Sequence, residues 1–212
     1  MQQYEIRQCQ AANCHFRFPV AVNDPAGESC PHCNEPTALA AKARHSVGSP
    51  RFQPIPYFPH IELLLDNIRS LYNVGAIMRT ADGAGVSHLH VGGITALPTH
   101  PKLAKTALGA EKALPWTQHR NGVHAVTQLK AAGYEIWALE GAAGAKNLFE
   151  ADLGVGENGR SILLVIGNEK TGVDPDILRL ADRIFALPMI GIKESLNVAV
   201  AFGIAIYQIQ FC

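Results

Sequence analysis

The chain has 212 residues, of which 48% are hydrophobic and 17% are charged, and its 18 Lys and Arg balance its 18 Asp and Glu. This composition can build a sizeable core, so it excludes a disordered chain, and its zero net charge excludes overall electrostatic attraction to nucleic acid. No apolar run reaches the length of a membrane span and the N-terminus lacks a signal-peptide core, so we expect a cytoplasmic protein with no membrane partner.

The first part of the chain carries four of the five cysteines in two close pairs. Cys9 and Cys14 have four residues between them, Cys30 and Cys33 have two, and fifteen residues separate the pairs. A chain without a secretion signal does not favour disulfides, whereas paired thiolates on two tight turns suit tetrahedral zinc. We therefore predict a zinc-ribbon-like unit over residues 1–41 with structural zinc, because so short a unit cannot build an adequate core alone. The alternatives are a redox pair at Cys30 and Cys33, or unrelated buried thiols.

Residues 42–59 separate this unit from the rest of the chain. The segment contains four prolines, which enforce extended backbone, three basic residues and no acidic residue. We predict a Pro-rich linker. Two interpretations of it stay open: a solvated connection whose aromatic side chains dock on the next domain, or a basic strip that contacts phosphate groups.

Residues 60–212 alternate between apolar segments of strand length and segments of helical periodicity. The predicted strands are residues 61–66, 86–91, 135–140, 161–167 and 183–188, and the predicted helices are residues 74–84, 122–132, 174–181 and 195–209. Strands that alternate with helices predict an α/β fold with a mostly parallel sheet covered on both faces.

Four polar residues are predicted to cap these helices. Asn121 and Asp174 precede the second and third helices, and Asn73 and Ser195 stand at the start of the first and last. The last helix is apolar nearly all round, which is typical of a buried helix. A central position in the domain, or partial burial by a second subunit, would each account for it.

Three short polar clusters interrupt the apolar pattern. They are residues 73–79 (NVGAIMR), 167–169 (GNE) and 195–197 (SLN). Each stands where a strand ends or a helix starts, which is where open α/β sheets bind ligands. Because buried polar groups are costly unless they are paired or used, the three clusters predict a single assembled site.

These clusters also carry a resemblance to a known family. Residues 67–85, 163–173 and 187–209 resemble, in order, the three motifs of the SpoU/TrmH RNA methyltransferases, and residues 100–116 resemble the region that connects the first two. The resemblance covers roughly residues 60–212. It implies a SPOUT-type sheet with a C-terminal trefoil knot, a homodimer, and S-adenosylmethionine as cofactor.

The same resemblance implies roles for individual residues. The implied cofactor-binding residues are Gly167, Asn168, Leu187, Met189, Ile190, Ser195 and Leu196. The glycine at the end of a strand would permit close ligand approach. From the pattern alone, residues 187, 189 and 190 are also interpreted as strand-end core.

The implied catalytic residues are Arg79, Asn73, Glu169, Ser195 and Asn197. In the family, the arginine is the proposed catalytic residue for ribose 2′-O methylation. Two roles stay open for it: a base activated by RNA phosphate, or a clamp that holds phosphate and orients the hydroxyl. A surface ion pair between Arg79 and Asp82 is the structural alternative. Glu169 is expected to orient Asn73 or Arg79.

The sequence therefore predicts an S-adenosylmethionine-dependent RNA 2′-O-methyltransferase that acts on tRNA or rRNA. A non-catalytic RNA-binding protein on the same scaffold is the alternative. A local group of basic residues either faces RNA or belongs to a solvated loop; its members are Lys102, Lys105, Lys112, His119 and Arg120.

Overall fold

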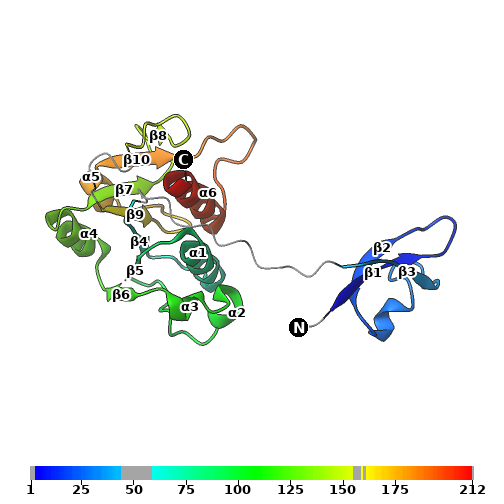
Figure 1. The fold of residues 1–212 in the computed structure, drawn as a ribbon. Coiled ribbons are helices and arrows are strands. Elements are labelled where there is room, and N and C mark those ends of the chain that lie inside the picture. Colours follow the sequence, from blue (N-terminus) through cyan, green and yellow to red (C-terminus); the bar gives the residue numbers. More distant parts are fainter. Residues whose placement is uncertain (1–2, 44–58, 155–158, 160, 212) are drawn as a thin grey trace. The chain divides into compact units, whose positions relative to one another are not determined.

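The computed structural model describes residues 3–43, 59–154, 159 and 161–211, and it divides into two compact units, Met1–Gln53 and Pro54–Cys212. Figure 1 shows both units. Most of the predicted linker, residues 44–58, lies outside the described residues.

The first unit is a small antiparallel sheet of three strands in the order β2-β1-β3. Its elements are β1 (Tyr4–Cys9), β2 (Arg17–Ala21), the 3-10 helix η1 (Pro25–Gly27) and β3 (Thr37–Lys42). Among its described residues only a few side chains are buried, and Cys9 and Cys30 are two of them. A sheet with so small an apolar core depends on a further source of stability.

The second unit is built on seven strands in the order β6-β5-β4-β9-β7-β10-β8, and every adjacent pair is parallel. The strands are β4 (Ile61–Asp66), β5 (His88–Gly92), β6 (Trp116–His119), β7 (Glu135–Leu139), β8 (Lys146–Asn147), β9 (Ile162–Ile166) and β10 (Arg183–Ala186). β4 and β9 are buried along their whole length because both faces are covered. The predicted fold class is confirmed, while the short edge strands β6 and β8 were not predicted.

Helices cover both faces of this sheet (Figure 1). They are α1 (Leu71–Ala84), α2 (Ala104–Ala107), α3 (Ala110–Ala113), α4 (Gly122–Ala131), α5 (Pro175–Leu180) and α6 (Val198–Phe211). The larger apolar core joins one sheet face to α1, α2, α3 and α6, and a smaller core joins the other face to α4 and α5. None of the helices within the described residues is long and apolar enough to span a membrane. The C-terminal trefoil knot stays a prediction.

Two of the four predicted helix caps are confirmed. The Asn121 side chain accepts from His124 N at 3.0 Å and the Asp174 side chain accepts from Asp176 N at 2.8 Å. The prediction that Asn73 caps α1 is wrong. Ser70 caps this helix one turn earlier, so the side-chain amide of Asn73 can bond other partners.

The predicted cap of the last helix is also wrong. The cap of α6 is Asn197 and not Ser195. The Asn197 Oδ1 accepts from Ala199 N at 2.9 Å, and the Asn197 backbone carbonyl accepts from Ala201 N at 2.9 Å. Helix α6 therefore begins three residues later than predicted, and Ser195 stays in an exposed segment before it.

Burial of α6 is one-sided within this chain. Phe202, Ala205, Ile206 and Ile209 are buried in the larger core. The opposite side leaves large apolar side chains 37–52% exposed; they are Val200, Ile204, Tyr207 and Phe211. A helix that is apolar all round is thus covered by its own domain on one side only.

A polar network lies on the α4 face of the sheet. Glu62 is 9% exposed and its carboxylate bonds His90 Nε2 at 2.7 Å and Tyr134 Oη at 2.7 Å. The other ring nitrogen of His90 lies 2.9 Å from His119 Nε2, and the His88 ring stacks obliquely on His90 at 4.8 Å. No sequence pattern indicates this network, because its members come from four separate strands and loops.

Candidate functional site

A cavity of about 600 Å³ opens at the carboxyl ends of the central strands. Its walls are the segments that follow β7, β9 and β10, the first turn of α1 and the start of α6. We call it the motif cavity, because residues of all three predicted clusters line it. This is the edge of a parallel sheet where ligands bind.

Glu169 joins the cluster after β9 to the start of α1. Its carboxylate accepts from Arg69 N and Ser70 N, each at 2.9 Å, and from Asn73 Nδ2 at 3.0 Å. Partial burial pushes the pKa of Glu169 up, but these three hydrogen bonds outweigh it, so the pKa lies below its ordinary value. Glu169 is therefore an ionised acceptor whose oxygens are already engaged.

Asn73 continues this chain of hydrogen bonds to the third cluster. It is 6% exposed, and its Oδ1 accepts from Asn197 Nδ2 at 3.0 Å. Because Asn197 also caps α6, the two amides fix the start of α6 against the start of α1. Residues 73, 169 and 197 are thus held together, although up to 124 residues separate them in the sequence.

Gly167 and Asn168 line the cavity but serve the loop that carries it. A Cβ atom on Gly167 would overlap the backbone of Gly172 and Val173. The absence of a side chain at position 167 therefore lets this backbone segment pack against the end of β9. Asn168 Nδ2 donates to Asn67 O at 2.7 Å, and its Oδ1 accepts from Lys170 N at 2.9 Å.

The segment between β10 and α6 differs from its predicted burial. Leu187 is partly buried, but Met189 is 37% exposed and Ile190 is fully exposed, so their interpretation as strand-end core is wrong. The reason is that β10 ends at Ala186 and the chain then leaves the sheet. Leu187, Met189, Ser195 and Leu196 line the motif cavity, whereas Ile190 does not.

Arg79 lies outside the motif cavity. It is exposed on α1, lines a separate cleft of about 540 Å³, and has no ion pair with Asp82 or any other residue of the described part of the chain. Six residues of helix separate it from Asn73, which places the two side chains on different sides of α1. We call this second hollow the Arg79 cleft.

The prediction from sequence missed two acidic residues of the motif cavity. Glu140 accepts from Val173 N at 2.8 Å and so ties the ends of β7 and β9 together, and Glu194 lies before α6. With Glu169 they give the lining three carboxylates against one lysine, Lys170. The position of Glu140 at the carboxyl end of a predicted strand was a usable signal.

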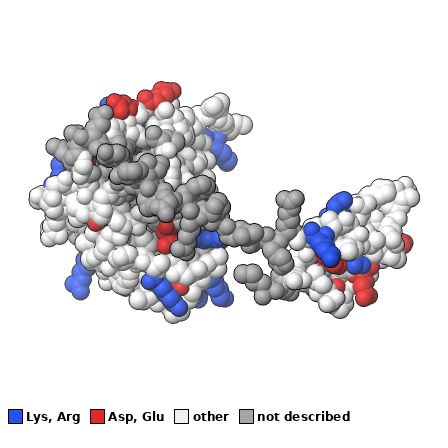
Figure 2. Space-filling view, viewed as in Figure 1, with Lys and Arg blue, Asp and Glu red and all other residues white. Residues whose placement is uncertain are grey.

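Charged side chains are dispersed on one face of the described residues (Figure 2). On the face that Figure 2 shows, the Lys and Arg side chains of the described residues are dispersed and do not merge into a continuous basic surface. Recognition of a charged partner would therefore depend on local groups.

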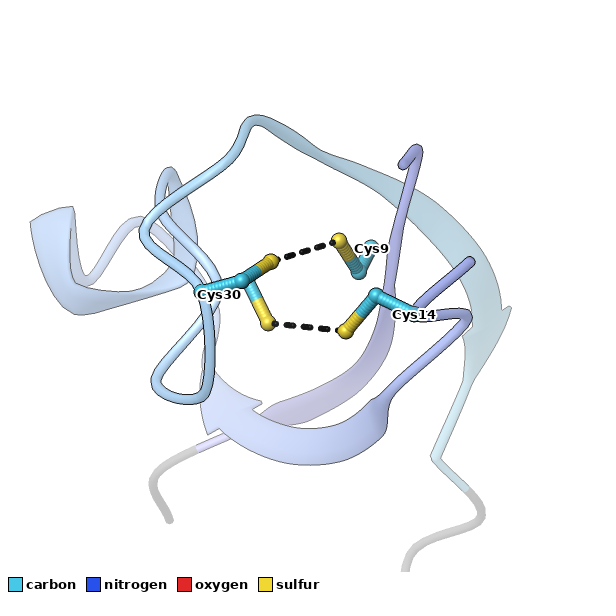
Figure 3. A group of neighbouring side chains, drawn as sticks. Cys9, Cys14 and Cys30 are labelled. Carbon is cyan, nitrogen blue, oxygen red and sulfur yellow. Dashed lines mark hydrogen bonds between the residues drawn. The ribbon is translucent and has the colours of Figure 1, made fainter. Parts of the chain in front are cut away.

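The four cysteines of the first unit converge on one point. Figure 3 shows the labelled Cys9, Cys14 and Cys30 turning their sulfur atoms toward a common space. These three Sγ atoms and that of Cys33 lie within 4.8 Å of one another, with separations of 3.5 Å for Cys9–Cys33 and 3.8 Å for Cys14–Cys30. Four thiolates at such distances can hold one tetrahedral metal, in which a metal–sulfur length of about 2.3 Å separates the sulfurs by about 3.8 Å.

Comparison with known proteins places the second unit. Residues 60–207 match the SpoU rRNA Methylase family. The tRNA (guanosine(18)-2'-O)-methyltransferase of Escherichia coli K12 is 33% identical over 155 residues, which cover 72% of this chain and 63% of that protein. The 23S rRNA (guanosine(2553)-2'-O)-methyltransferase RlmP of Bacillus subtilis is 33% identical over 150 residues, which cover 70% and 57%. The chain thus spans less than two thirds of the length of these relatives.

Among solved structures, the AdoMet-bound rRNA methyltransferase from Sinorhizobium meliloti aligns with a TM-score of 0.65 and 28% identity, covering 75% of this chain and 60% of that one. The family match at residues 60–207 includes every residue that lines the motif cavity.

Proposed function

The chain belongs to the SpoU rRNA methylase family, and from this premise we propose that it transfers a methyl group from S-adenosylmethionine to a ribose 2′-hydroxyl of structured RNA, either tRNA or rRNA. The observation that carries the proposal is the chain of hydrogen bonds from Glu169 through Asn73 to Asn197, which assembles the three motifs at the rim of one cavity. Relatives named as methyltransferases of tRNA and of rRNA support both substrate classes.

The motif cavity fits the cofactor in size and charge. S-adenosylmethionine, when bound, supplies an electrophilic methyl group on a positively charged sulfonium. The three carboxylates of the lining favour such a cation, and about 600 Å³ suits a ligand of this size. The residues that we propose to hold it are Gly167, Asn168, Leu187, Met189, Ser195 and Leu196; Ile190 is left out because it does not line the cavity.

The residues around the cavity divide the remaining work. Glu169 is a positioning residue rather than a base, because its oxygens are engaged by three donors and its pKa lies below the ordinary value. Ser195 is exposed at the cavity wall, where its hydroxyl can donate to RNA. Arg79 carries a permanent charge, so we assign it the role of a clamp that holds phosphate and orients the ribose hydroxyl.

We further propose that the protein is a homodimer formed over α6. The exposed apolar side of this helix and the exposed apolar residues of the preceding segment give one chain an uncovered surface. Tyr207 belongs to that side of α6 and also lines the Arg79 cleft, so a second copy packed on α6 would lie next to Arg79.

For the first unit we propose a structural zinc ion held by Cys9, Cys14, Cys30 and Cys33, with domain limits at 1–41, 42–59 and 60–212. The sulfur separations suit tetrahedral zinc, and each of the buried thiols accepts a backbone N–H at 3.4 Å, from Ala11 to Cys9 and from His32 to Cys30. Metal analysis of the purified protein tests this proposal. One zinc per chain in the wild type, lost in Cys30→Ser, supports it. A wild type without zinc, together with a Cys30→Ser variant that melts at the same temperature, refutes it.

The proposed reaction is tested by methyl transfer from labelled S-adenosylmethionine to unmodified total RNA, followed by nucleoside mass spectrometry. A single 2′-O-methylated nucleoside identifies the reaction and narrows the substrate. Failure to bind S-adenosylhomocysteine would refute the proposal and favour a non-catalytic RNA-binding role.

A further inference from the structure

The Arg79 cleft is lined by residues of α1, of the α2 segment and of α6, which contributes Tyr207. α1 contributes Tyr72, Arg79 and Thr80, and the segment from α2 contributes Lys105 and Leu108. Tyr72 and Leu108 are 69% and 63% exposed. The cleft is thus an open hollow with aromatic and apolar walls and two cationic side chains.

The position of Lys105 is fixed by how α2 packs. A Cβ atom on Gly75 would stand 2.7 Å from Thr106 Cβ and would overlap the Thr106 hydroxyl, so the absence of a side chain at this position of α1 lets α2 make direct contact. Leu103 and Ala107 on either side of Lys105 are 0% and 1% exposed and anchor the short helix in the core. Lys105 therefore lies on the exposed side of a helix that is packed against α1 and the core.

The charges of the cleft have no partners within the described part of the chain. Neither Arg79 nor Lys105 forms an ion pair there, and the lining includes no aspartate or glutamate. This is the reverse of the motif cavity, whose lining has three carboxylates and one lysine. Two cations without an ion pair beside the exposed Tyr72 ring suit a phosphate of a nucleic acid strand, of which a base can lie on the ring.

The cleft also lies within reach of the motif cavity. Asn73 belongs to the cavity and Arg79 to the cleft, and six residues of α1 place them about 9 Å apart along the helix axis. A phosphate held at Arg79 and Lys105 would thus leave neighbouring nucleotides beside the hydrogen-bonded residues Asn73, Glu169 and Asn197.

Resting on the proposed function, we propose that Lys105 is a substrate-positioning residue that binds, together with Arg79, a backbone phosphate of the RNA target strand. Of the five basic residues at positions 102–120, it is the one that lines the cleft. His119 is bonded to His90 on the opposite face of the sheet, and Lys102, Lys112 and Arg120 do not line the cleft.

The test compares Lys105→Gln with Lys146→Gln, which removes the same charge from an exposed residue of β8 at the far edge of the sheet. RNA affinity is measured by filter binding across a salt series, and KM and kcat are measured for the RNA that the wild type methylates. Lys105→Gln should raise KM for RNA several-fold and reduce the slope of log affinity against log salt by about one. Lys146→Gln should change neither, and Lys105→Arg should restore both.

Three outcomes separate the possible failures. An unchanged salt slope in Lys105→Gln, in an enzyme that methylates RNA, overturns the assignment of Lys105 and leaves the proposed function standing. If Lys105→Gln changes the salt slope of RNA binding but the wild type transfers no methyl group, the assignment of Lys105 stands and the proposed function is refuted. Loss of dimer in Lys105→Gln, seen by light scattering, would make the cleft a contact between copies and overturn the assignment.

Discussion

The motif cavity and the Arg79 cleft share helix α1, yet they hold their polar groups in opposite ways. In the cavity, Glu169, Asn73 and Asn197 are bonded to one another and to the backbone before any ligand arrives. In the cleft, Arg79 and Lys105 have no ionic partner within the described residues. The difference teaches that one region is organised by the chain itself, whereas the other obtains its counter-charge from a partner.

The sharpest way to break this comparison is to remove the charge from the cleft. Arg79→Ala should lower methyl transfer by on the order of 10²–10³, because the clamp that orients the hydroxyl is lost. Affinity for S-adenosylhomocysteine should stay near the wild-type value, since Arg79 does not line the cavity. Single-turnover transfer and calorimetry measure the two effects, and a large loss of cofactor affinity would contradict the separation of the regions.

A second change tests the organisation of the cavity. Glu169→Gln keeps the shape but removes the ionised acceptor of Arg69 N, Ser70 N and Asn73 Nδ2. Misplacement of the motifs should reduce transfer about tenfold or more, with a loss of about 1 kcal/mol in unfolding free energy. Denaturant unfolding and kcat measure these. Transfer that is unchanged would mean that the bonded network has no part in catalysis.

Acid should destabilise the opposite face of the sheet before it reaches the cavity. Burial and the charge of neighbouring histidines lower the pKa of His88 and His119 from their ordinary value. The unfolded chain then binds more protons, so stability should fall as pH drops through about 6.5 toward the folded pKa. A urea midpoint that does not decrease between pH 7.5 and 5.5, or that decreases equally in His119→Asn, would count against this origin.

Glu62 responds to stronger acid. Burial raises its pKa, but hydrogen bonds from His90, Tyr134 and His60 outweigh burial and place the pKa below the ordinary value. Its contribution is therefore present above the unfolded pKa and is lost as pH falls through the lower, folded one. The same urea series extended below pH 5 would detect this second loss, which should be absent in Glu62→Gln.

The smallest effect is expected for a control variant that lowers the stability of the protein without changing its methyl transfer. Asn121→Ala removes the cap of α4, whose side chain accepts from His124 N at 3.0 Å. It should cost about 1 kcal/mol of unfolding free energy and leave transfer unchanged at a temperature where the protein is folded. A drop in kcat comparable with that of Glu169→Gln would show that general destabilisation explains both.

Local signals predicted the parts of this fold that local physics determines. The runs at 61–66 and 161–167 are strands because unbroken apolar residues suit a sheet covered on both faces. The caps Asn121 and Asp174 act within their own helices. Asn73 was misjudged because its partners, Glu169 and Asn197, are distant in sequence and claim its amide.

The three motifs were predicted to form a single site. Their separation into two hollows was not predicted. The first motif contains both Asn73 and Arg79, but the turn of the helix sends them into different hollows. Ile190 was interpreted as core because it is apolar, although the chain leaves the sheet before it. Glu140 and Lys105 lie outside the three motifs, and only the packing of the strands and helices assigns Glu140 to the motif cavity and Lys105 to the Arg79 cleft.

The direct contact of α1 and α2 at Gly75 makes two positions of the sequence interdependent. A side chain at position 75 would collide with Thr106 Cβ, so it can be introduced only with a change at position 106 or a displacement of α2. Substitutions at the two positions should therefore be non-additive: Gly75→Ala alone should be more damaging than Gly75→Ala combined with Thr106→Gly. One methyl group on a helix far from Lys105 in sequence would thereby shift the charge that faces the substrate.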